Sequence, residues 1–308
     1  MRHMPEAACR LAPLPSLGAI SVTGEDAADF LAAQLSQVPP RTGAAQAPLA
    51  GWHDAKGRLQ ALFRVICRDD GYLLITHESV VEDVTTSLRR FVLRAKVTIH
   101  MPTDFACVAL MGDSAQWLAE QRIGLDTGIG SAATEDDVAW LRLGPMLVHA
   151  ATTIDGIDRI AHELPSGSAA EAELAEIRLG IPNLSAELRG QFLPQMLNLD
   201  VLGGVAFDKG CYPGQEIIAR TQNLGTVKRR MLHFTSDADT APPVASVLLD
   251  GSGGSAGVVV RAAPAPKGIE LLAVTRLDAL TQVLTCSEPA GSTARLEDLP
   301  YALPGLEP

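Results

Sequence analysis

Residues 208–220 read Asp208-Lys-Gly-Cys-Tyr-Pro-Gly-Gln-Glu-Ile-Ile-Ala-Arg220, with a thiol, two glycines and a proline between a glycine-rich loop and an apolar helical turn. Pro213 suits the first turn of a helix. Cys211 would then lie just ahead of a helix N-terminus, whose dipole favours the thiolate, as does the charge of Lys209. Cys211 is therefore the candidate reactive thiol. The alternative is a buried, inert cysteine in a tight turn.

The composition of the whole chain is that of a folded globular protein. Apolar residues make up 47% of the 308 residues and charged residues 20%, which excludes disorder and fibrous repeats. This length predicts two or three domains. The net charge of −11 argues against a protein-wide basic surface for nucleic acid or an anionic membrane. Any anion-binding site must therefore be local.

Two basic islands stand out in this acidic chain. The first contains Lys209, Arg220, Lys228, Arg229 and Arg230 against one acidic residue, Glu216, and the second contains Arg89, Arg90, Arg94 and Lys96. Such islands are suited to the carboxylates or phosphates of a small anionic ligand. The alternative is that they are ordinary solvated faces of helices and strands.

The cysteines and the apolar stretches bear on the compartment. The cysteines are Cys9, Cys67, Cys107, Cys211 and Cys286, an odd number without C-x-x-C spacing. This pattern predicts reduced thiols of the cytoplasm. No apolar stretch is long enough to span a bilayer, and the N-terminus does not resemble a signal peptide. The histidines lack the spacing of a zinc site and are expected to be structural or on the surface.

The order of predicted elements indicates an α+β protein. The run GAISV predicts a strand, and Thr23–Asp26 predicts a capping box that opens a helix. Further capping boxes are predicted at Ser79–Glu82, ahead of a helix with Val81, Val84, Leu88 and Phe91 on one face, and at Ser168–Glu171, ahead of a helix that stops at Gly180. From about Val227 onward, short β-like runs between Pro- and Gly-rich turns predict a small barrel or sandwich.

The motif around Cys211 also resembles a known family. Lys209-Gly-Cys-Tyr-Pro-Gly-Gln-Glu216, followed by Ala219-Arg220, is similar to the K-G-C-[FY]-x-G-Q-E signature of the YgfZ family of folate-binding proteins. That family is related to the aminomethyltransferase, or T-protein, of the glycine cleavage system. Segments 51–61, 90–97, 192–200 and 203–207 resemble further parts of the family pattern, so the resemblance spans nearly the whole chain.

This resemblance implies a GcvT/YgfZ-like fold of three domains in a ring around a central channel that binds tetrahydrofolate. Two α+β lobes of the folate-binding region would occupy residues 1–226, with lobe boundaries near residues 50 and 100 and with either continuous or discontinuous lobes. A C-terminal β-barrel would occupy residues 227–308. Family members support the assembly or repair of iron–sulfur clusters in client enzymes, including radical-type tRNA-modifying enzymes. The implied partners are reduced folate and either client enzymes or cluster-assembly proteins, with no direct contact to nucleic acid or membrane.

The motif positions receive roles accordingly. Cys211 is the expected essential thiol and Lys209 its electrostatic partner, while Gly210 and Gly214 would let the backbone bend close to a ligand or partner. The expected folate contacts are Lys209, Tyr212, Gln215, Glu216, Arg220 and Arg94. Tyr212, Gln215 and Glu216 would either hold the turn or face the channel, and Arg220 would pair with a carboxylate of the ligand's glutamate tail or of the protein.

One departure from the T-protein pattern separates the alternatives. The T-protein keeps an aspartate pair after its K-G-G segment, whereas here Lys56-Gly57-Arg58-Leu59-Gln60 is followed by Ala61 and Leu62. Without a carboxylate there, an active aminomethyltransferase is not expected. The rival hypothesis is a folate-dependent one-carbon transferase or demethylase, with Asp54 as a substitute carboxylate and Cys211 structural. A third is a scaffold that holds a client and binds folate as a regulator.

Overall fold

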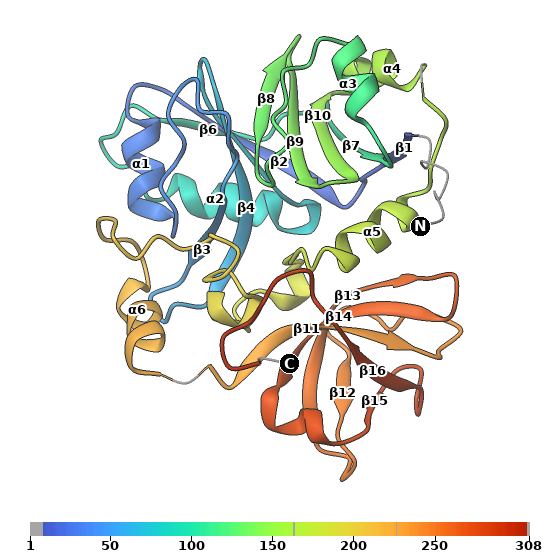
Figure 1. The fold of residues 1–308 in the computed structure, drawn as a ribbon. Helices are drawn as coiled ribbons and strands as arrows, with labels where there is room; N and C mark the ends of the chain where they lie inside the picture. The colour runs from blue at the N-terminus through green and yellow to red at the C-terminus, as the bar shows by residue number, and fades with distance from the viewer. Residues whose placement is uncertain (1–8, 163, 226, 307–308) are drawn as a thin grey trace. The chain divides into compact units, whose positions relative to one another are not determined.

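The computed structural model describes residues 9–162, 164–225 and 227–306, which form two compact units built from interleaved segments (Figure 1). The first unit consists of Met1–Phe30, Pro39–Pro48 and Arg64–Ala175, and the second of Leu31–Val38, Leu49–Phe63 and Glu176–Pro308. Sequence-distant segments thus share a core in each unit. Within the described residues, no helix combines the length and apolar character needed to cross a membrane.

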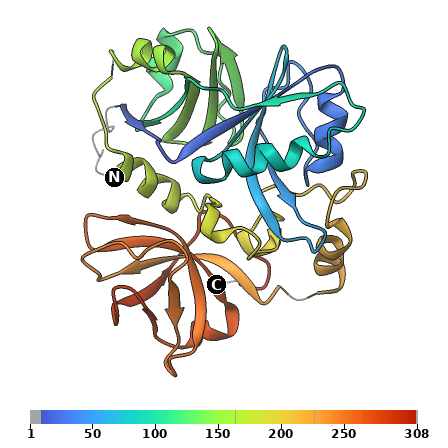
Figure 2. The same ribbon diagram turned by 180° about the vertical axis from the view of Figure 1, so that it is seen from behind.

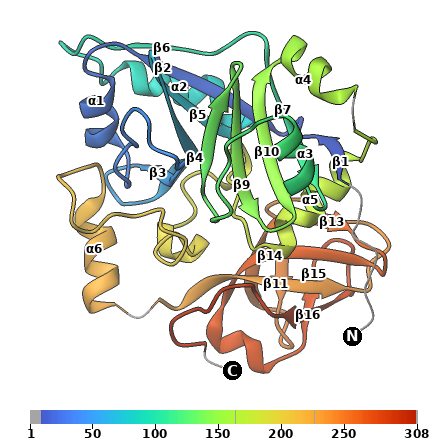
Figure 3. The ribbon, with the colours of Figure 1, turned by 45° about the horizontal axis from the view of Figure 1, so that its top comes forward.

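The first unit contains an antiparallel five-stranded sheet of order β1-β7-β10-β9-β8 (Figure 3). Its strands are β1 (Arg10–Pro13), β7 (Phe105–Met111), β8 (Ala132–Glu135), β9 (Val138–Gly144) and β10 (Leu147–Thr153). Helices α3 (Ala115–Glu120) and α4 (Ile154–Ala161) cover one face, where Leu118 and Ile160 pack against Val108, Trp140 and Val148.

A second five-stranded sheet has the order β3-β4-β5-β2-β6. Its strands are β2 (Leu17–Thr23), β3 (Leu49–His53), β4 (Leu59–Arg68), β5 (Gly71–His77) and β6 (Thr98–His100). The division between the two units falls within β4, so β3 belongs to the second unit. Helix α2 (Val81–Arg89) packs on β2 and β6 (Figure 2). Helix α1 (Ala27–Gln34) follows β2 in the chain.

The second unit ends in a closed β-barrel of order β11-β14-β13-β12-β15-β16, as the sequence predicted. The strands are β11 (Arg229–Ser236), β12 (Val247–Leu249), β13 (Ser255–Pro264), β14 (Ile269–Arg276), β15 (Leu284–Cys286) and β16 (Thr293–Glu297). Their inward residues, including Phe234, Leu271 and Cys286, form one apolar core. The remaining helices are α5 (Ala169–Arg178) and α6 (Gln215–Leu224), with short 3₁₀ helices at Glu78–Val80, Ala186–Leu188, Pro194–Leu197 and Leu277–Thr281.

One of the predicted capping boxes is confirmed. The Ser168 backbone N–H donates to a Glu171 carboxylate oxygen at 2.8 Å, and the Glu171 N–H donates to Ser168 Oγ at 3.2 Å. These reciprocal bonds satisfy N–H groups at the start of α5 that have no partner inside the helix. After α5 the chain turns at Gly180, whose φ is +63°.

The predicted capping box at Thr23–Asp26 is wrong. The Asp26 N–H donates to the Lys96 carbonyl, and its carboxylate accepts the Lys96 N–H at 2.7 Å. A backbone segment distant in sequence therefore takes the bonds that Thr23 was expected to make, and α1 begins at Ala27.

The predicted box at Ser79–Glu82 is also wrong. A 3₁₀ turn over Glu78–Val80 precedes α2, and its N-cap is His77, which accepts the Ser79 N–H. Val84 and Leu88 are buried as expected, but Phe91 lies beyond the helix end and is 49% exposed.

Candidate functional site around Cys211

Within the second unit, the loop that carries Cys211 belongs to a cluster of three chain segments, 32–38, 51–58 and 203–220. The fully buried Ser36 links them. Its hydroxyl donates to the Gly204 carbonyl at 2.6 Å and accepts the Gly51 N–H at 2.8 Å. Its backbone bonds to Gly51 and Ala206 as well. Buried hydrogen bonds of this kind fix the spacing of the segments because breaking one leaves an unpaired polar group.

The turn between β3 and β4 and the Cys211 loop touch through two glycines. A Cβ added to Gly214 would lie 2.5 Å from Gly57 Cα and 2.6 Å from the Asp54 carbonyl oxygen. Gly214 has φ +78° and Gly57 φ +72°, a region that side chains rarely occupy. The two family segments, 51–61 and 209–216, therefore meet backbone to backbone. Gly214 approaches another part of this chain, and Gly210 has open space around its Cα.

Helix α6 begins at Gln215 with Gly214 as its N-cap. Pro213 thus lies in the turn before the helix, and its predicted place in the first helical turn is wrong. The buried amide of Gln195 donates to the Ile218 carbonyl at 2.9 Å and holds the helix from the other side. Cys211 lies on the loop that precedes α6. Of the five cysteines, all of which lie in the described part of the chain, Cys211 alone is exposed.

Lys209 has partners that the sequence did not predict. Its ammonium donates to the Ala32 carbonyl at 2.6 Å and to the Leu35 carbonyl, at the C-terminal end of α1. It also lies 4.8 Å from the centroid of the Tyr212 ring, within cation–π range. Burial lowers the pKa of Lys209 to about 8. The Lys209 ammonium therefore ties the Cys211 loop to a helix end, where a cation is favoured.

His53 is a residue of this cluster that the sequence did not single out. It ends β3, is 2% exposed, and neither ring nitrogen has a hydrogen-bond partner among the described residues. Its ring centroid is 6.0 Å from that of Tyr212. Burial, with a smaller contribution from the charge of Lys209, lowers the pKa of His53 to about 3, so the imidazole is neutral. Its place inside family segment 51–61 was the only signal available.

The other predicted ligand contacts fall into two groups. Tyr212 is 6% exposed, burial raises its pKa to about 12, and Gln215 donates to the Lys209 carbonyl at 3.4 Å. Both therefore belong to the interior of the loop. Glu216 and Arg220 are exposed on α6, and Arg94 is exposed in the first unit between α2 and β6.

The two basic islands are partly used within the protein. Arg230 is 2% exposed and forms a bidentate pair with Asp200 at 2.6 and 2.9 Å, so the expectation that it holds a ligand anion is wrong. Lys96 pairs with Glu25 at 2.6 Å, and Arg89 donates to the Ile99 carbonyl. The guanidinium groups of Arg220 and Arg94 form no hydrogen bond or ion pair with other described residues.

Asp54 has a local structural role. One of its carboxylate oxygens accepts the N–H groups of Lys56 and Arg58, both at 2.9 Å, and so closes the turn between β3 and β4. The Arg58 guanidinium in turn donates to the Gln191 carbonyl. Ala61 and Leu62, which stand where the T-protein pattern has carboxylates, are buried in β4.

Comparisons with known proteins decide the family. No protein-family model matches the chain. It is 30% identical over 305 residues to the tRNA-modifying protein YgfZ of Colwellia psychrerythraea, which covers 95% of this chain and 93% of that protein. The chain belongs to the YgfZ family. The YgfZ protein of Klebsiella pneumoniae is similar as well, with 29% identity over 299 residues that cover 92% of this chain and 90% of that one.

The fold of this YgfZ-family protein has a counterpart among solved structures. Aminomethyltransferase T of the glycine cleavage system from Bartonella henselae superposes with a TM-score of 0.76, over 96% of this chain and 87% of that one. The sequence identity is 15%, so this likeness concerns the fold alone. Both the resemblance to YgfZ and the predicted GcvT-like α+β fold with a C-terminal barrel are confirmed.

Proposed function

We propose that this YgfZ-family protein binds tetrahydrofolate and supports the assembly or repair of iron–sulfur clusters in client enzymes, with Cys211 as the acting thiol. The observation that carries the proposal is an exposed cysteine on a loop that three sets of contacts hold in place. Gly214 packs against Gly57, Lys209 is bonded to the end of α1, and Ser36 joins the supporting segments. The loop that carries Cys211 is held in this way, so the thiol can be presented to a partner without the loop first having to be ordered.

The same loop explains why Cys211 would act with a partner. Cys286, the other cysteine in the described part of the second unit, is buried in the barrel core. A lone exposed thiol suits a transient mixed disulfide or one ligand of a cluster shared with another protein. A reactive thiol of this kind works in the reducing cytoplasm. The clients include enzymes that modify tRNA, in agreement with the name of the relatives.

The residues present fit a folate in type. In the second unit, Arg220 is an exposed cation suited to the carboxylates of a glutamate tail, and Glu216 is an exposed acceptor for ring N–H groups. Arg94 is an exposed cation of the same type in the first unit. The unpartnered nitrogens of His53 lie beside Tyr212, within the loop's own interior. When bound, tetrahydrofolate would supply a reduced pterin able to carry a one-carbon group. This chain's residues would bind its tail and orient it.

The rival function, one-carbon transfer to or from a small amine, has less support in the geometry. It needs a carboxylate to handle the proton and the developing charge. Ala61 and Leu62 offer none, and the Asp54 carboxylate is already bonded to two backbone N–H groups of its own turn. The third hypothesis, a scaffold that holds a client and binds folate as a regulator, differs from the proposal in one testable respect: it does not require the Cys211 thiol.

Complementation of a strain that lacks the protein tests the role of the thiol. Cys211→Ala should abolish recovery of iron–sulfur enzyme activity, whereas Cys67→Ala, at a partly exposed cysteine of the first unit, should restore it fully. Full recovery with Cys211→Ala would overturn the thiol mechanism and leave the scaffold reading.

Calorimetry with purified protein tests the folate. Tetrahydrofolate should bind saturably, and binding should weaken with added salt and in Arg220→Gln, because the tail carboxylates lose a cation. Absence of binding at millimolar folate would reject the cofactor. Turnover of a methylated amine in the presence of tetrahydrofolate would favour the rival function instead.

A further inference from the structure

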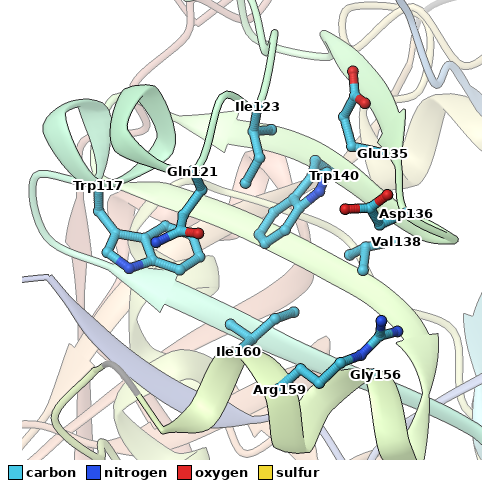
Figure 4. Close-up of a pocket in the computed structure, with 10 residues that line it drawn as sticks. All are labelled: Trp117, Gln121, Ile123, Glu135, Asp136, Val138, Trp140, Gly156, Arg159 and Ile160. Atoms are coloured by element: carbon cyan, nitrogen blue, oxygen red, sulfur yellow. The ribbon is translucent and has the colours of Figure 1, made fainter.

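The first unit carries a pocket that the proposed function does not use. It lies between α3, the turn that joins β8 to β9, strand β9 and α4, and its volume is about 170 Å³ (Figure 4). A cavity of about this size accommodates one benzene-sized group. All of its lining residues belong to the first unit, whereas the Cys211 loop belongs to the second. The pocket therefore needs an account of its own.

Two tryptophans form an aromatic corner in this pocket. The ring centroids of Trp117 and Trp140 are 5.8 Å apart and their planes are inclined by 57°. Trp140 is 3% exposed and fixed in the sheet core with Ile160, while Trp117 on α3 is partly exposed. Because the rings meet at an angle, a compact rounded group can touch both. Tryptophan is the side chain whose ring face attracts a cation most strongly.

Carboxylates stand on the opposite rim. Glu135 and Asp136 are both exposed and line the pocket, and in Figure 4 the Asp136 carboxylate is turned toward Trp140. Asp136 and its neighbour Asp137 occupy the turn between β8 and β9 with φ +48° and +65°. Aspartate tolerates such backbone angles better than most side chains, although glycine or asparagine fits them with less strain. The turn thus holds a negative charge at the mouth of an apolar corner.

The geometry points to a binding site for a quaternary or fully methylated ammonium group. Such a group combines a diffuse positive charge with an apolar surface, which matches indole faces below and carboxylates at the rim. A primary ammonium is strongly hydrated and has three N–H donors that the indole faces do not accept, so it gains less from the aromatic corner than a methylated ammonium does. A phosphate would be repelled by the carboxylates. A metal ion lacks a ligand set, because no group of three or more His, Cys, Asp or Glu side chains comes together in the described residues.

Arg159 on α4 also lines the pocket and is exposed. Its guanidinium carries the same sign as the ligand that we infer, so it should weaken binding through the solvent. Replacing it with Gln removes that repulsion and keeps a polar side chain of similar reach. Tighter binding by Arg159→Gln is therefore specific to a cationic ligand, because an apolar or anionic ligand would bind equally well or more weakly.

Choline and its uncharged isostere 3,3-dimethyl-1-butanol provide the direct test with full-length protein. Calorimetry should show millimolar binding of choline that is about fivefold or more tighter than that of the alcohol, the difference expected from a cation–π contribution. A short peptide with one trimethyl-lysine, measured in parallel, distinguishes a protein-borne ammonium from a free metabolite. Tighter binding of the peptide would assign the group to a modified protein.

Variants and indole NMR signals locate the site. The chain has 3 tryptophans, and the signals of Trp117 and Trp140 should shift with choline while that of Trp52 stays in place. Asp136→Asn should weaken choline about threefold or more, since an adjacent charge is lost and the turn is kept. Asp137→Asn is the matched control in the same turn, outside the lining, and should change affinity less. Trp117→Leu should remove binding, with circular dichroism to verify the fold.

Equal affinity for choline and the alcohol would overturn the inference, because the pocket would then be a plain apolar depression. The inference would also be overturned if choline showed no saturable binding at about 0.1 M, roughly 100 times the expected millimolar dissociation constant. A shift confined to Trp52, or equal losses in Asp136→Asn and Asp137→Asn, would place any observed binding elsewhere.

Discussion

Gly214 lies so close to the backbone of Gly57 that position 214 leaves no room for a side chain. Alanine at 214 would place its methyl group 2.5 Å from Gly57 Cα while the backbone remains at φ +78°. The sequence predicted freedom for both Gly210 and Gly214, but the structure requires it only at Gly214. A Cβ added to Gly210 would have no other atom within 4 Å, and the φ angle of Gly210 is not positive. The two glycines of one motif therefore serve different purposes.

This difference yields a prediction with an internal control. Gly214→Ala should lower the free energy of unfolding by about 2 kcal/mol or more, because strain and overpacking add. Gly210→Ala should be neutral or stabilise by a few tenths of a kcal/mol, since it only restricts the unfolded chain. Urea unfolding measures both. Equal effects would contradict the contact between the loop and the turn after β3.

His53 predicts how stability depends on pH. The pKa of His53 is lowered from 6.5 to about 3 in the folded protein, so between these values the unfolded chain binds a proton that the folded one does not. Stability should therefore fall as the pH drops from about 6.5 toward 3. His53→Phe keeps a ring of similar size and removes both the titration and the unpaired nitrogens. It should flatten this acid loss and be at least as stable at pH 7, measured by urea unfolding at pH 7 and pH 4.5.

An unchanged slope in His53→Phe would assign the acid loss to other groups. The same variant also tests whether His53 contributes to the site. If the His53→Phe variant is stable but its Cys211 reacts more slowly with a thiol probe, or if it binds tetrahydrofolate more weakly, His53 supports the site through Tyr212 and Lys209.

Among the secondary-structure elements, the local sequence predicted which segments are helical more accurately than it predicted where each helix begins. The box at Ser168–Glu171 forms because both partners lie within one turn and no other group competes for them. At Asp26 the partner is Lys96, a residue far along the chain, and no local pattern contains that information. Before α2 the expected cap is replaced by another local one, because His77 accepts the N–H of Ser79 two residues ahead. A tertiary hydrogen bond therefore displaces the predicted cap at Asp26, and a competing local side chain displaces it at Ser79.

The turn between β3 and β4 gives a prediction that also separates the two functions. Asp54→Asn keeps an oxygen for the N–H groups of Lys56 and Arg58, whereas Asp54→Ala removes it and should cost about 1–2 kcal/mol. If Asp54 only closes the turn, Asn should preserve complementation and Ala should reduce it in step with stability. Loss of function in a fully stable Asn variant would instead mark Asp54 as the acid or base of one-carbon chemistry.

For the whole molecule, the sequence predicted the α+β class, the barrel and the family, because strand runs and the Cys211 motif are local signals. It did not predict that segments 31–38 and 49–63 join the second unit, since this depends on packing such as that of Ser36 against Gly204 and Gly51. For the same reason it did not reveal the hydrogen-bond partners of Lys209 and Arg230, which are distant in sequence. Charge counts along a chain do not reveal which cations are already paired inside the fold.

The composition of the whole molecule also predicts what it cannot do alone. Iron–sulfur clusters are generally held by four protein ligands, and Cys211 is the one exposed cysteine, with Cys107 and Cys286 buried in separate units. The purified monomer should therefore carry no stable cluster after anaerobic reconstitution and gel filtration, as measured by iron and sulfide content. Cys211→Ala should match the wild-type protein in this assay while failing in complementation. A stable, stoichiometric cluster on the monomer that disappears in Cys211→Ala would mean that the cluster resides here, and its remaining ligands would have to come from a rearranged fold.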